Sequence, residues 1–238
     1  MTPRIRPMST RPLRSLALFG GSFDPIHSGH IAVARAARRR FHLDAIHFIP
    51  AGLPPHKRDR ELAPYAHRYA MVALACAGIR EFIASPLEAG KDSSGRETFY
   101  SIDVMRRYRE RSPAGQRLWF VIGADAFLDI GAWREPEALL GSCDFIVASR
   151  PGIDFSMIQR AVPPQLLDSA GSSSRAAAKR PAAQKNIALR STTLHILDSV
   201  ASPVSSTEIR RRVAAGLSIR GLVPAAVEDY IWKSALYR

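Results

Sequence analysis

The sequence predicts an α/β protein built on a doubly wound parallel sheet. Short apolar runs that end at Gly or Pro alternate with segments whose apolar residues recur at helical spacing, which is the pattern of repeated strand–helix units. The chain has 238 residues, 46% of them hydrophobic, enough to fill the core of one large domain. No apolar run reaches the roughly 18 residues that a membrane-spanning helix needs, which excludes an integral membrane protein.

The strands are predicted from the apolar runs. The run at 16–19 ends at two glycines and the run at 45–49 ends at a proline, as expected of buried strands that lead into loops. The run at 118–122, Leu-Trp-Phe-Val-Ile, is the most convincing buried strand of the chain. Three further runs complete the predicted sheet: 82–84, 145–148 and 191–197.

The helices are predicted from apolar positions three and four residues apart. In the first helix, 30–41, four Arg residues lie toward the end, where cations interact favourably with the helix dipole. The same spacing predicts helices at 98–111 and 224–236, and helices are also predicted at 62–77, 136–140 and 207–215. Because right-handed crossovers bring the carboxyl ends of parallel strands to one edge, we expect ligands to bind in the loops that follow strands.

The charge of the chain is unevenly distributed. Lys and Arg number 34 against 21 Asp and Glu, a formal net charge of +13, and most of the cations are Arg. Nine of the cations lie in two segments that contain no acid, 1–15 and 169–190, and both have the composition of flexible polypeptide. We therefore expect a flexible basic arm at 1–15 and a single domain at 16–238, with a disordered insertion at about 169–190.

A strongly basic chain indicates either a polyanionic partner or the Arg-rich codons of a high-GC genome. A nucleic-acid-binding module would carry its chemistry on a basic face with interleaved aromatic residues, and the sequence has no recognised RNA or DNA motif. The motifs described below fall in loops after strands instead. Nucleic acid is therefore disfavoured as the main partner.

The two cysteines point to a reducing compartment. Cys76 and Cys143 lie far apart in apolar surroundings and form no CxxC motif or disulfide framework. The apolar run after the basic N-terminal segment is too short for a signal peptide. A cytoplasmic protein without a membrane partner is the expectation.

The first motif with chemical meaning runs from Gly20 to His30, Gly-Gly-Ser-Phe-Asp-Pro-Ile-His-Ser-Gly-His. Two glycines after a buried strand let main-chain amides approach an anion, and His27 and His30 can converge on one phosphate beside the positive end of a helix. The motif is neither a P-loop nor a GxGxxG dinucleotide fingerprint. Capping or packing of the two histidines, and a zinc pair, are the alternatives; zinc would need further ligands, and the other histidines form no second pair.

Two further motifs follow the next strands. Lys57 ends a proline-rich loop after the strand at 45–49 and is a compact charge suited to a phosphate, although alone it would be a solvated lysine. Asp125 follows the strand at 118–122 and can accept hydrogen bonds from ribose hydroxyls. Trp133 offers a broad face for stacking a heteroaromatic ring, with burial in the core as the alternative.

The last motif is Ser205-Ser-Thr-Glu-Ile-Arg210. Ser205 and Glu208 have the spacing of a capping box, so helix capping is the simplest interpretation. The same helix start presents amides and hydroxyls to a phosphate, with Arg210 one turn into the helix.

Taken together and in this order, the motifs resemble those of bacterial nicotinate-nucleotide adenylyltransferases, a family of the HxGH nucleotidyltransferase superfamily. The resemblance covers 16–238 apart from the insertion. It depends on His27–His30, on Pro-Pro-His-Lys ending at Lys57, on the Gly-Ala-Asp segment with Trp133, and on the segment ending at Arg210. The sequence departs from the family at Ser22 (usually Thr), at Ala51-Gly52 (often Asn-rich) and at Phe99 (usually a small hydroxyl residue).

The resemblance implies a Rossmann-like nucleotidyltransferase fold and transfer of AMP from ATP to nicotinate mononucleotide, giving deamido-NAD and pyrophosphate in NAD biosynthesis. It implies Mg²⁺ held chiefly through the ATP phosphates, with no metal-binding residues on the protein. The implied catalytic residues are His27, His30, Lys57 and Arg210. The implied ATP-binding residues are Gly20, Gly21, Ser22, Phe23, Ser205, Ser206 and Thr207. The implied mononucleotide-binding residues are Thr98, Tyr100, Ser101, Asp125 and Trp133.

Several questions stay open at the level of sequence. Another member of the superfamily, such as a phosphopantetheine adenylyltransferase or a cytidylyltransferase for a phospho-alcohol, is the nearest alternative, and the motifs at Lys57 and Trp133 argue against both. The sequence does not decide between the acid and the amide mononucleotide, nor whether the chain forms a homo-oligomer.

Overall fold

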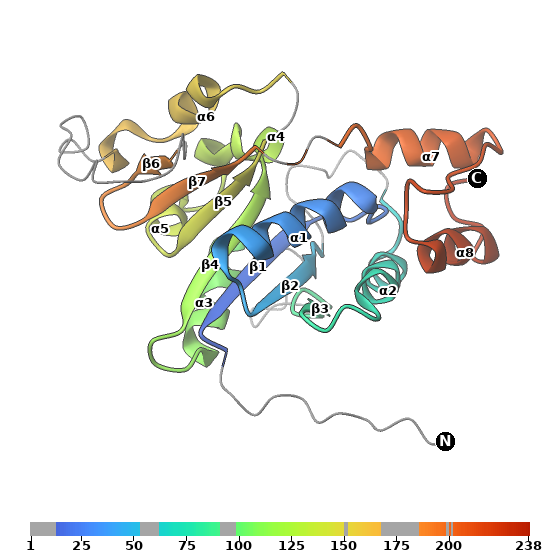
Figure 1. Ribbon diagram of the computed structural model, residues 1–238, viewed down its shortest axis with the longest axis horizontal. Helices are drawn as coiled ribbons and strands as arrows, with labels where there is room; N and C mark the ends of the chain where they lie inside the picture. The colour runs from blue at the N-terminus through green and yellow to red at the C-terminus, as the bar shows by residue number, and fades with distance from the viewer. Residues whose placement is uncertain are drawn as a thin grey trace.

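The computed structural model describes residues 13–52, 62–90, 99–149, 152–167, 186–198, 200 and 202–238. It contains one seven-stranded sheet with helices on both sides (Figure 1). In spatial order the strands are β3 (Phe82–Ala84), β2 (Ala45–Pro50), β1 (Ser15–Gly21), β4 (Arg117–Gly123), β5 (Asp144–Ala148), β7 (Thr193–Leu197) and β6 (Asn186–Ala188). All neighbouring strands run parallel except β6, which is antiparallel to β7. The predicted α/β class and doubly wound sheet are confirmed.

Helices cover both faces of the sheet because successive strand residues point to opposite sides. In β1, Ala17 and Phe19 face one core and Leu16 and Leu18 face the other, all at most 5% exposed. The helices that contribute to the first core are α1 (Ser28–Phe41), α2 (Tyr65–Cys76), α7 (Ser206–Ala214) and α8 (Ala225–Lys233). Those that contribute to the second are α3 (Ser101–Arg111), α4 (Ala124–Phe127), α5 (Pro136–Leu140) and α6 (Phe155–Ala161).

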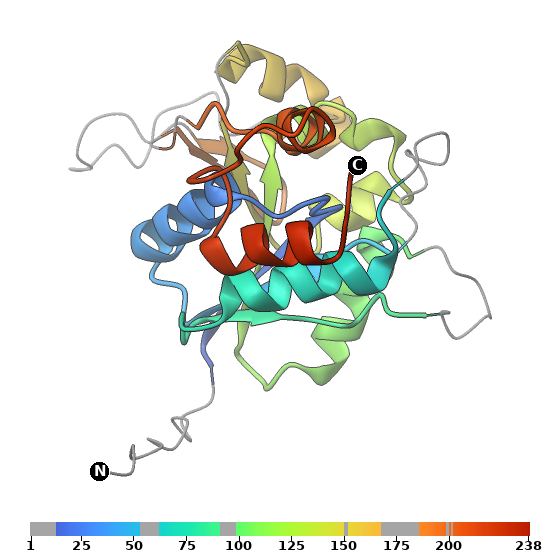
Figure 2. The same ribbon diagram turned by 90° about the vertical axis from the view of Figure 1, so that its right-hand side faces the viewer.

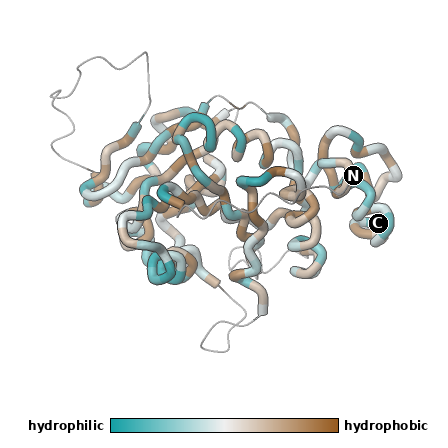
Figure 3. The backbone as a smooth tube through the Cα atoms, turned by 60° about the horizontal axis from the view of Figure 1, so that its bottom comes forward, coloured by the Kyte–Doolittle hydropathy of each residue, from teal (hydrophilic) through white to brown (hydrophobic). Residues whose placement is uncertain are grey.

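The C-terminal helices return to the N-terminal half of the sheet. Figure 2 shows α8 beside α2, and the Tyr230 hydroxyl on α8 lies 2.9 Å from Nδ1 of His67 on α2. The main-chain N–H of Ser28, at the start of α1, donates to the carbonyl of Leu222 at 2.9 Å. Hydrophobic stretches run through the middle of the chain trace, between the flanking helices (Figure 3). The C-terminal segment is therefore part of the same packing unit as β1 and α1.

The boundaries of the predicted arm and insertion differ in the structure. Residues 1–12 lie outside the described part of the chain, but Ser15 already begins β1, and the main-chain N–H groups of Arg14 and Ser15 both donate to the carboxylate of Asp44. Residues 168–185 also lie outside it, whereas 186–188 form β6, so the prediction of a disordered segment reaching residue 190 is wrong at its C-terminal end. The short run Asn-Ile-Ala was missed because its strand is defined by pairing with β7.

None of the helices in the described residues is long and apolar enough to cross a membrane.

Short helical segments at α4, α6, η2 (Ile130–Ala132) and η3 (Pro164–Leu166) were not predicted. Three to seven residues span too few turns to show helical periodicity in a sequence, and α5, which is equally short, was predicted without that signal.

Candidate active site

Most of the predicted site residues line one pocket of about 300 Å³, here called the main pocket. It lies at the carboxyl ends of β1, β4 and β5. β1 and β4 are adjacent at the point where the strand order reverses, which is where doubly wound sheets bind ligands. The predicted residues that line it are Gly20, Gly21, Ser22, Phe23, His27, His30, Asp125, Ser205, Ser206, Thr207 and Arg210.

The two histidines of the motif stack on each other at the start of α1. His27 is the N-cap residue, only 2% exposed, and its ring centroid lies 3.7 Å from that of His30. The main-chain N–H of His27 donates to Nδ1 of His30 at 3.2 Å. Because Nδ1 accepts this hydrogen bond, a neutral His30 carries its proton on Nε2. The local fold thus makes Nε2 of His30 a hydrogen-bond donor.

The glycine between the histidines is required by their packing. A Cβ atom at Gly29 would lie 2.8 Å from Oγ of Ser202 and 3.0 Å from Cε1 of His27. Such distances would force the His27 ring or the 202 segment to move. Gly29 therefore leaves room for the His27 ring in the lining of the main pocket.

Phe23 packs against His30, the second histidine of the motif. It is 1% exposed, has a left-handed backbone with φ of 46°, and packs edge-on against His30 with 5.0 Å between ring centroids. Phe19 on β1 also packs edge-on against His30, at 5.9 Å. Aromatic packing from two directions restricts the His30 ring to one orientation.

The start of α7 also lines the main pocket. Ser205 caps the helix by accepting a hydrogen bond from the main-chain N–H of Glu208 at 3.2 Å, which confirms the predicted cap. The Ser206 hydroxyl donates to the carbonyl of Pro25 at 3.0 Å, so the helix is attached to the loop after β1. Two helix N-termini, those of α1 and α7, therefore border the same pocket and favour an anion in it.

Arg210 is held on the edge of the main pocket by several contacts. Its guanidinium donates to the main-chain carbonyl of Asp24 and, at 3.2 Å, to the hydroxyl of Thr207. Nη1 also lies 3.5 Å from Oδ2 of Asp24, and the Arg210 side chain is 17% exposed. The cation is thus anchored by the loop after β1 while it remains accessible from the pocket.

Asp125 lies across the main pocket, at the start of α4. It is exposed, and a Cβ atom at Gly123 would lie 2.6 Å from its Oδ1. Gly123 therefore gives room to the Asp125 carboxylate at the end of β4. The structure places Asp125 at the carboxyl edge of the sheet, in the lining of the main pocket.

The residues predicted to bind the mononucleotide ring do not line the main pocket. Tyr100 and Trp133 are partly buried against the second core, and Cζ of Arg134 lies 4.7 Å from the centroid of the Tyr100 ring. Ser101 begins α3, directly after Tyr100. Lys57 and Thr98 lie outside the described residues. The structure therefore brings the start of α3 near the Trp133 segment, as a second group separate from the main pocket.

Glu88 is a buried carboxyl that the sequence did not single out. It is 8% exposed, and its Oε2 accepts a hydrogen bond from the main-chain N–H of Gly52 at 2.8 Å, in the loop after β2. Burial raises the pKa of Glu88 to about 7, although the Gly52 N–H and the charges of Arg68 and Arg107 act in the opposite direction. Glu88 thus connects the loop after β2 to the segment after β3 through a group that titrates near neutral pH.

Arg68 on α2 connects three loops of the site and was also missed. It is 2% exposed, and its guanidinium donates only to main-chain carbonyls within the described residues. These carbonyls belong to Ser22 at 2.9 Å, Ala51 at 2.6 Å, Gly52 at 2.8 Å and Ala63 at 2.8 Å. No sequence signal separates this Arg from the many exposed ones.

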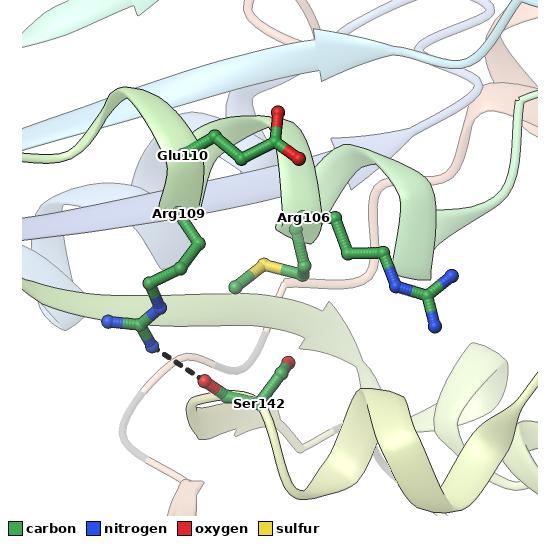
Figure 4. A pocket seen from close by; sticks show the side chains of 5 residues that line it. Arg106, Arg109, Glu110 and Ser142 are labelled. Carbon is green, nitrogen blue, oxygen red and sulfur yellow. Dashed lines mark hydrogen bonds between the residues drawn. The ribbon is translucent and has the colours of Figure 1, made fainter.

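A second hollow, about 270 Å³, lies between α3 and the end of α5 (Figure 4). It contains none of the predicted site residues. Its lining cations are already engaged: Arg109 donates to the carbonyl of Ser142 at 2.7 Å, and Arg106 pairs with Glu135 at 2.5 Å. We interpret it as a junction between the two helices.

The described residues contain no group of three or more His, Cys, Asp or Glu side chains that could hold a metal ion. The zinc alternative for His27 and His30 therefore finds no third and fourth ligand in that part of the chain. A cation that enters with a nucleotide would depend on phosphate oxygens and water, which is how Mg²⁺ usually binds.

The switch point of this doubly wound sheet carries two helix N-termini, paired histidines and an arginine. These features together define a nucleotide-binding protein of the nucleotidyltransferase class. Residues 18–212 match the family model described as cytidylyltransferase-like. A relative from Geobacter sulfurreducens, named "Probable nicotinate-nucleotide adenylyltransferase", is 38% identical over 92% of this chain and 96% of its own. A relative of the same name from Solibacter usitatus is 39% identical over 89% of this chain and 94% of its own.

The chain belongs to the nicotinate-nucleotide adenylyltransferases, within the cytidylyltransferase-like family. Solved structures agree with the fold. A Plasmodium falciparum nicotinic acid mononucleotide adenylyltransferase complexed with NaAD has a TM-score of 0.67 at 21% identity, covering 94% of this chain and 97% of that one. The same enzyme complexed with APC has a TM-score of 0.66 at 20% identity, with the same coverage.

The burial of Glu88 predicts a pH-dependent contribution to stability. The folded state holds the Glu88 proton up to about pH 7, whereas an unfolded Glu loses it near pH 4.5, so the stabilisation is complete below pH 4.5 and is lost as the pH rises through 7. We expect the difference in the free energy of unfolding between Glu88→Gln and the unchanged chain to shift by about 3 kcal/mol in favour of Glu88→Gln from pH 4.5 to pH 8. Urea unfolding of both proteins at the two pH values measures this; an equal difference at both would contradict it.

Proposed function

We propose that this chain transfers the adenylyl group of ATP to nicotinate mononucleotide and releases pyrophosphate. The observation that carries the proposal is the main pocket, in which the paired histidines, the α7 N-terminus and Arg210 converge at the switch point of the sheet. The membership of the chain in the nicotinate-nucleotide adenylyltransferases supports the choice of acceptor.

The reaction needs no enzyme nucleophile. A phosphate oxygen of the mononucleotide, ionised near neutral pH, attacks the α-phosphorus of ATP, and the bond from that phosphorus to the oxygen bridging to the β-phosphate breaks. The electron pair leaves with pyrophosphate. Catalysis then consists of positioning the two phosphates in line and stabilising the charge that develops on the α-phosphate.

We assign the α-phosphate to His27 and His30. A donor on Nε2 of His30, fixed by the hydrogen bond that Nδ1 accepts, is suited to a phosphate oxygen in the transition state. Arg210, together with Lys57, would hold the rest of the triphosphate. The main-chain amides and hydroxyls that would complete the ATP site belong to Gly20, Gly21, Ser22, Phe23, Ser205, Ser206 and Thr207.

We assign the mononucleotide to Asp125 and to the second group of residues. Asp125 would accept hydrogen bonds from a ribose, and Trp133 would stack on the pyridine ring. Donors near Tyr100 and Ser101, with Thr98, would bind the ring carboxylate. Mg²⁺ would be held through the β- and γ-phosphates and would supply charge neutralisation there.

The proposal is tested by offering the protein each of several acceptors with ATP and Mg²⁺ and measuring pyrophosphate. Nicotinate mononucleotide, nicotinamide mononucleotide, phosphopantetheine and a phospho-alcohol form the series, with CTP replacing ATP in a parallel set. We expect the highest kcat/KM with ATP and nicotinate mononucleotide. Faster reaction with any other pair would assign the chain a different substrate.

Replacing the second histidine tests the proposed stabilisation of the transition state. We expect His30→Ala to lower kcat by about 100-fold or more, because one preorganised donor to the reacting phosphate is lost. Steady-state kinetics measure the change, with His42→Asn as the matched control. His42 is exposed, ends the same helix and has a φ of 51°, a conformation that Asn tolerates. Near-normal turnover of His30→Ala would refute the assignment.

Removing the Trp133 ring tests the proposed stacking. Trp133→Ala should raise KM for the mononucleotide by about tenfold, with a smaller effect on kcat, while Trp133→Phe keeps an aromatic face and should recover most of the affinity. Kinetics with each substrate varied in turn distinguish the two sites, and thermal unfolding checks that both variants fold. A rise in KM for ATP alone would show that Trp133 does not contact the mononucleotide.

A further inference from the structure

A buried carboxylate connects the C-terminal segment of the described chain to the main pocket. Asp24, in the loop after β1, is 1% exposed. Its Oδ1 accepts a hydrogen bond from the hydroxyl of Tyr237 at 2.8 Å and a longer one from the main-chain N–H of Ala63 at 3.3 Å. Its other oxygen, Oδ2, lies 3.5 Å from Nη1 of Arg210. Tyr237 and Arg210 therefore contact the two oxygens of one carboxylate.

The position of Arg210 depends on that residue of the loop after β1. The guanidinium donates to the main-chain carbonyl of Asp24 and pairs with its side chain, and its remaining described hydrogen bond goes to Thr207 on its own helix. A shift of the Asp24 carboxylate would move the charged partner of a cation that lines the pocket.

The Tyr237 hydroxyl is a neutral hydrogen-bond donor to Asp24. A charged donor in its place would compete with Arg210 for the carboxylate. Burial first, and then the negative charge of Asp24, raise the pKa of Tyr237 above its usual range, so the hydroxyl keeps its proton at neutral pH. Without this donor, Oδ1 would retain, within the described residues, only the 3.3 Å contact with the main-chain N–H of Ala63. A buried carboxylate oxygen that loses its donor is destabilised unless the group moves to another partner, and Nη1 of Arg210 already lies 3.5 Å from Oδ2.

We propose that Tyr237 is a positioning residue for the triphosphate site: its hydroxyl holds the Asp24 carboxylate so that Arg210 faces the main pocket and binds the phosphates of ATP. The inference rests on the proposed function for the role of Arg210. Tyr237 lies outside the pocket lining and more than 200 positions along the chain from Asp24. The proposal adds it to the residues that determine the affinity for ATP.

A double-mutant cycle on ATP binding tests this proposal. We expect Tyr237→Phe to raise the dissociation constant of ATP about tenfold in the full chain, measured by titration calorimetry. In an Arg210→Ala background the same substitution should change the dissociation constant less than twofold, because the residue through which Tyr237 acts is gone. Equal losses in the two backgrounds, or no loss in Tyr237→Phe alone, would overturn the proposal.

Tyr230→Phe is the matched control. Tyr230 lies on α8, and its hydroxyl contacts Nδ1 of His67 at 2.9 Å. We expect this variant to bind ATP like the unchanged chain, and thermal unfolding of both Phe variants separates a loss of stability from a loss of affinity. A tenfold weaker affinity in the control as well would assign the effect to the packing of the C-terminal segment and would overturn the proposal.

The experiment separates this inference from the proposed function because ATP binding needs no acceptor. If Tyr237 and Arg210 are coupled in ATP binding but no pyrophosphate is released with nicotinate mononucleotide, the role of Tyr237 is supported and the proposed acceptor is wrong. If pyrophosphate is released but the two residues are not coupled, the acceptor is supported and the role of Tyr237 is wrong.

Discussion

The geometry of the site depends on one buried cation. Within the described residues, the Arg68 guanidinium donates only to main-chain carbonyls, and these belong to the loops after β1 and β2 and to the segment before α2. Burial lowers the pKa of Arg68, and the charge of Asp24 is the main factor that raises it again. Because Asp24 also pairs with Arg210 and accepts from Tyr237, the buried cation and the accessible one share an anion. Removal of Arg68 would leave four carbonyls without that donor and a carboxylate with one cation fewer.

The part of the fold that follows from local physics was predictable. β1, β2, β4 and β5 are buried on both faces, so their sequences are continuous apolar runs, and their predicted bounds agree with the structure to within two residues. The same holds for the main pocket: the carboxyl ends of parallel strands lie at one edge of the sheet, so the sequence alone places the loops that contain His30 and Asp125 at that edge. The cap at Ser205 was predictable from its spacing to Glu208.

The rest was not predictable because it depends on partners remote in the sequence. β6 is a strand only because β7 is beside it, and its three residues carry no pattern of their own. Glu88 and Arg68 look like ordinary surface charges in a sequence, since burial is decided by the loops that fold over them. Trp133 illustrates the same limit for the site: its type indicated stacking, but its placement beside the start of α3, apart from the main pocket, required the packing of the second core.

The pairing of Asp24 with Tyr237, 213 residues away, has a kinetic consequence. Ser28 likewise bonds to Leu222, and Ser206 to Pro25, so the loop that follows the first strand is completed by the C-terminal segment that contains α7 and α8. Contacts between such distant segments close very long loops, and the entropy lost in closing them delays their formation relative to the pairing of neighbouring strands. We therefore expect neighbouring strands to pair before these contacts form, so that the loop after β1, on the edge of the main pocket, is completed late in folding.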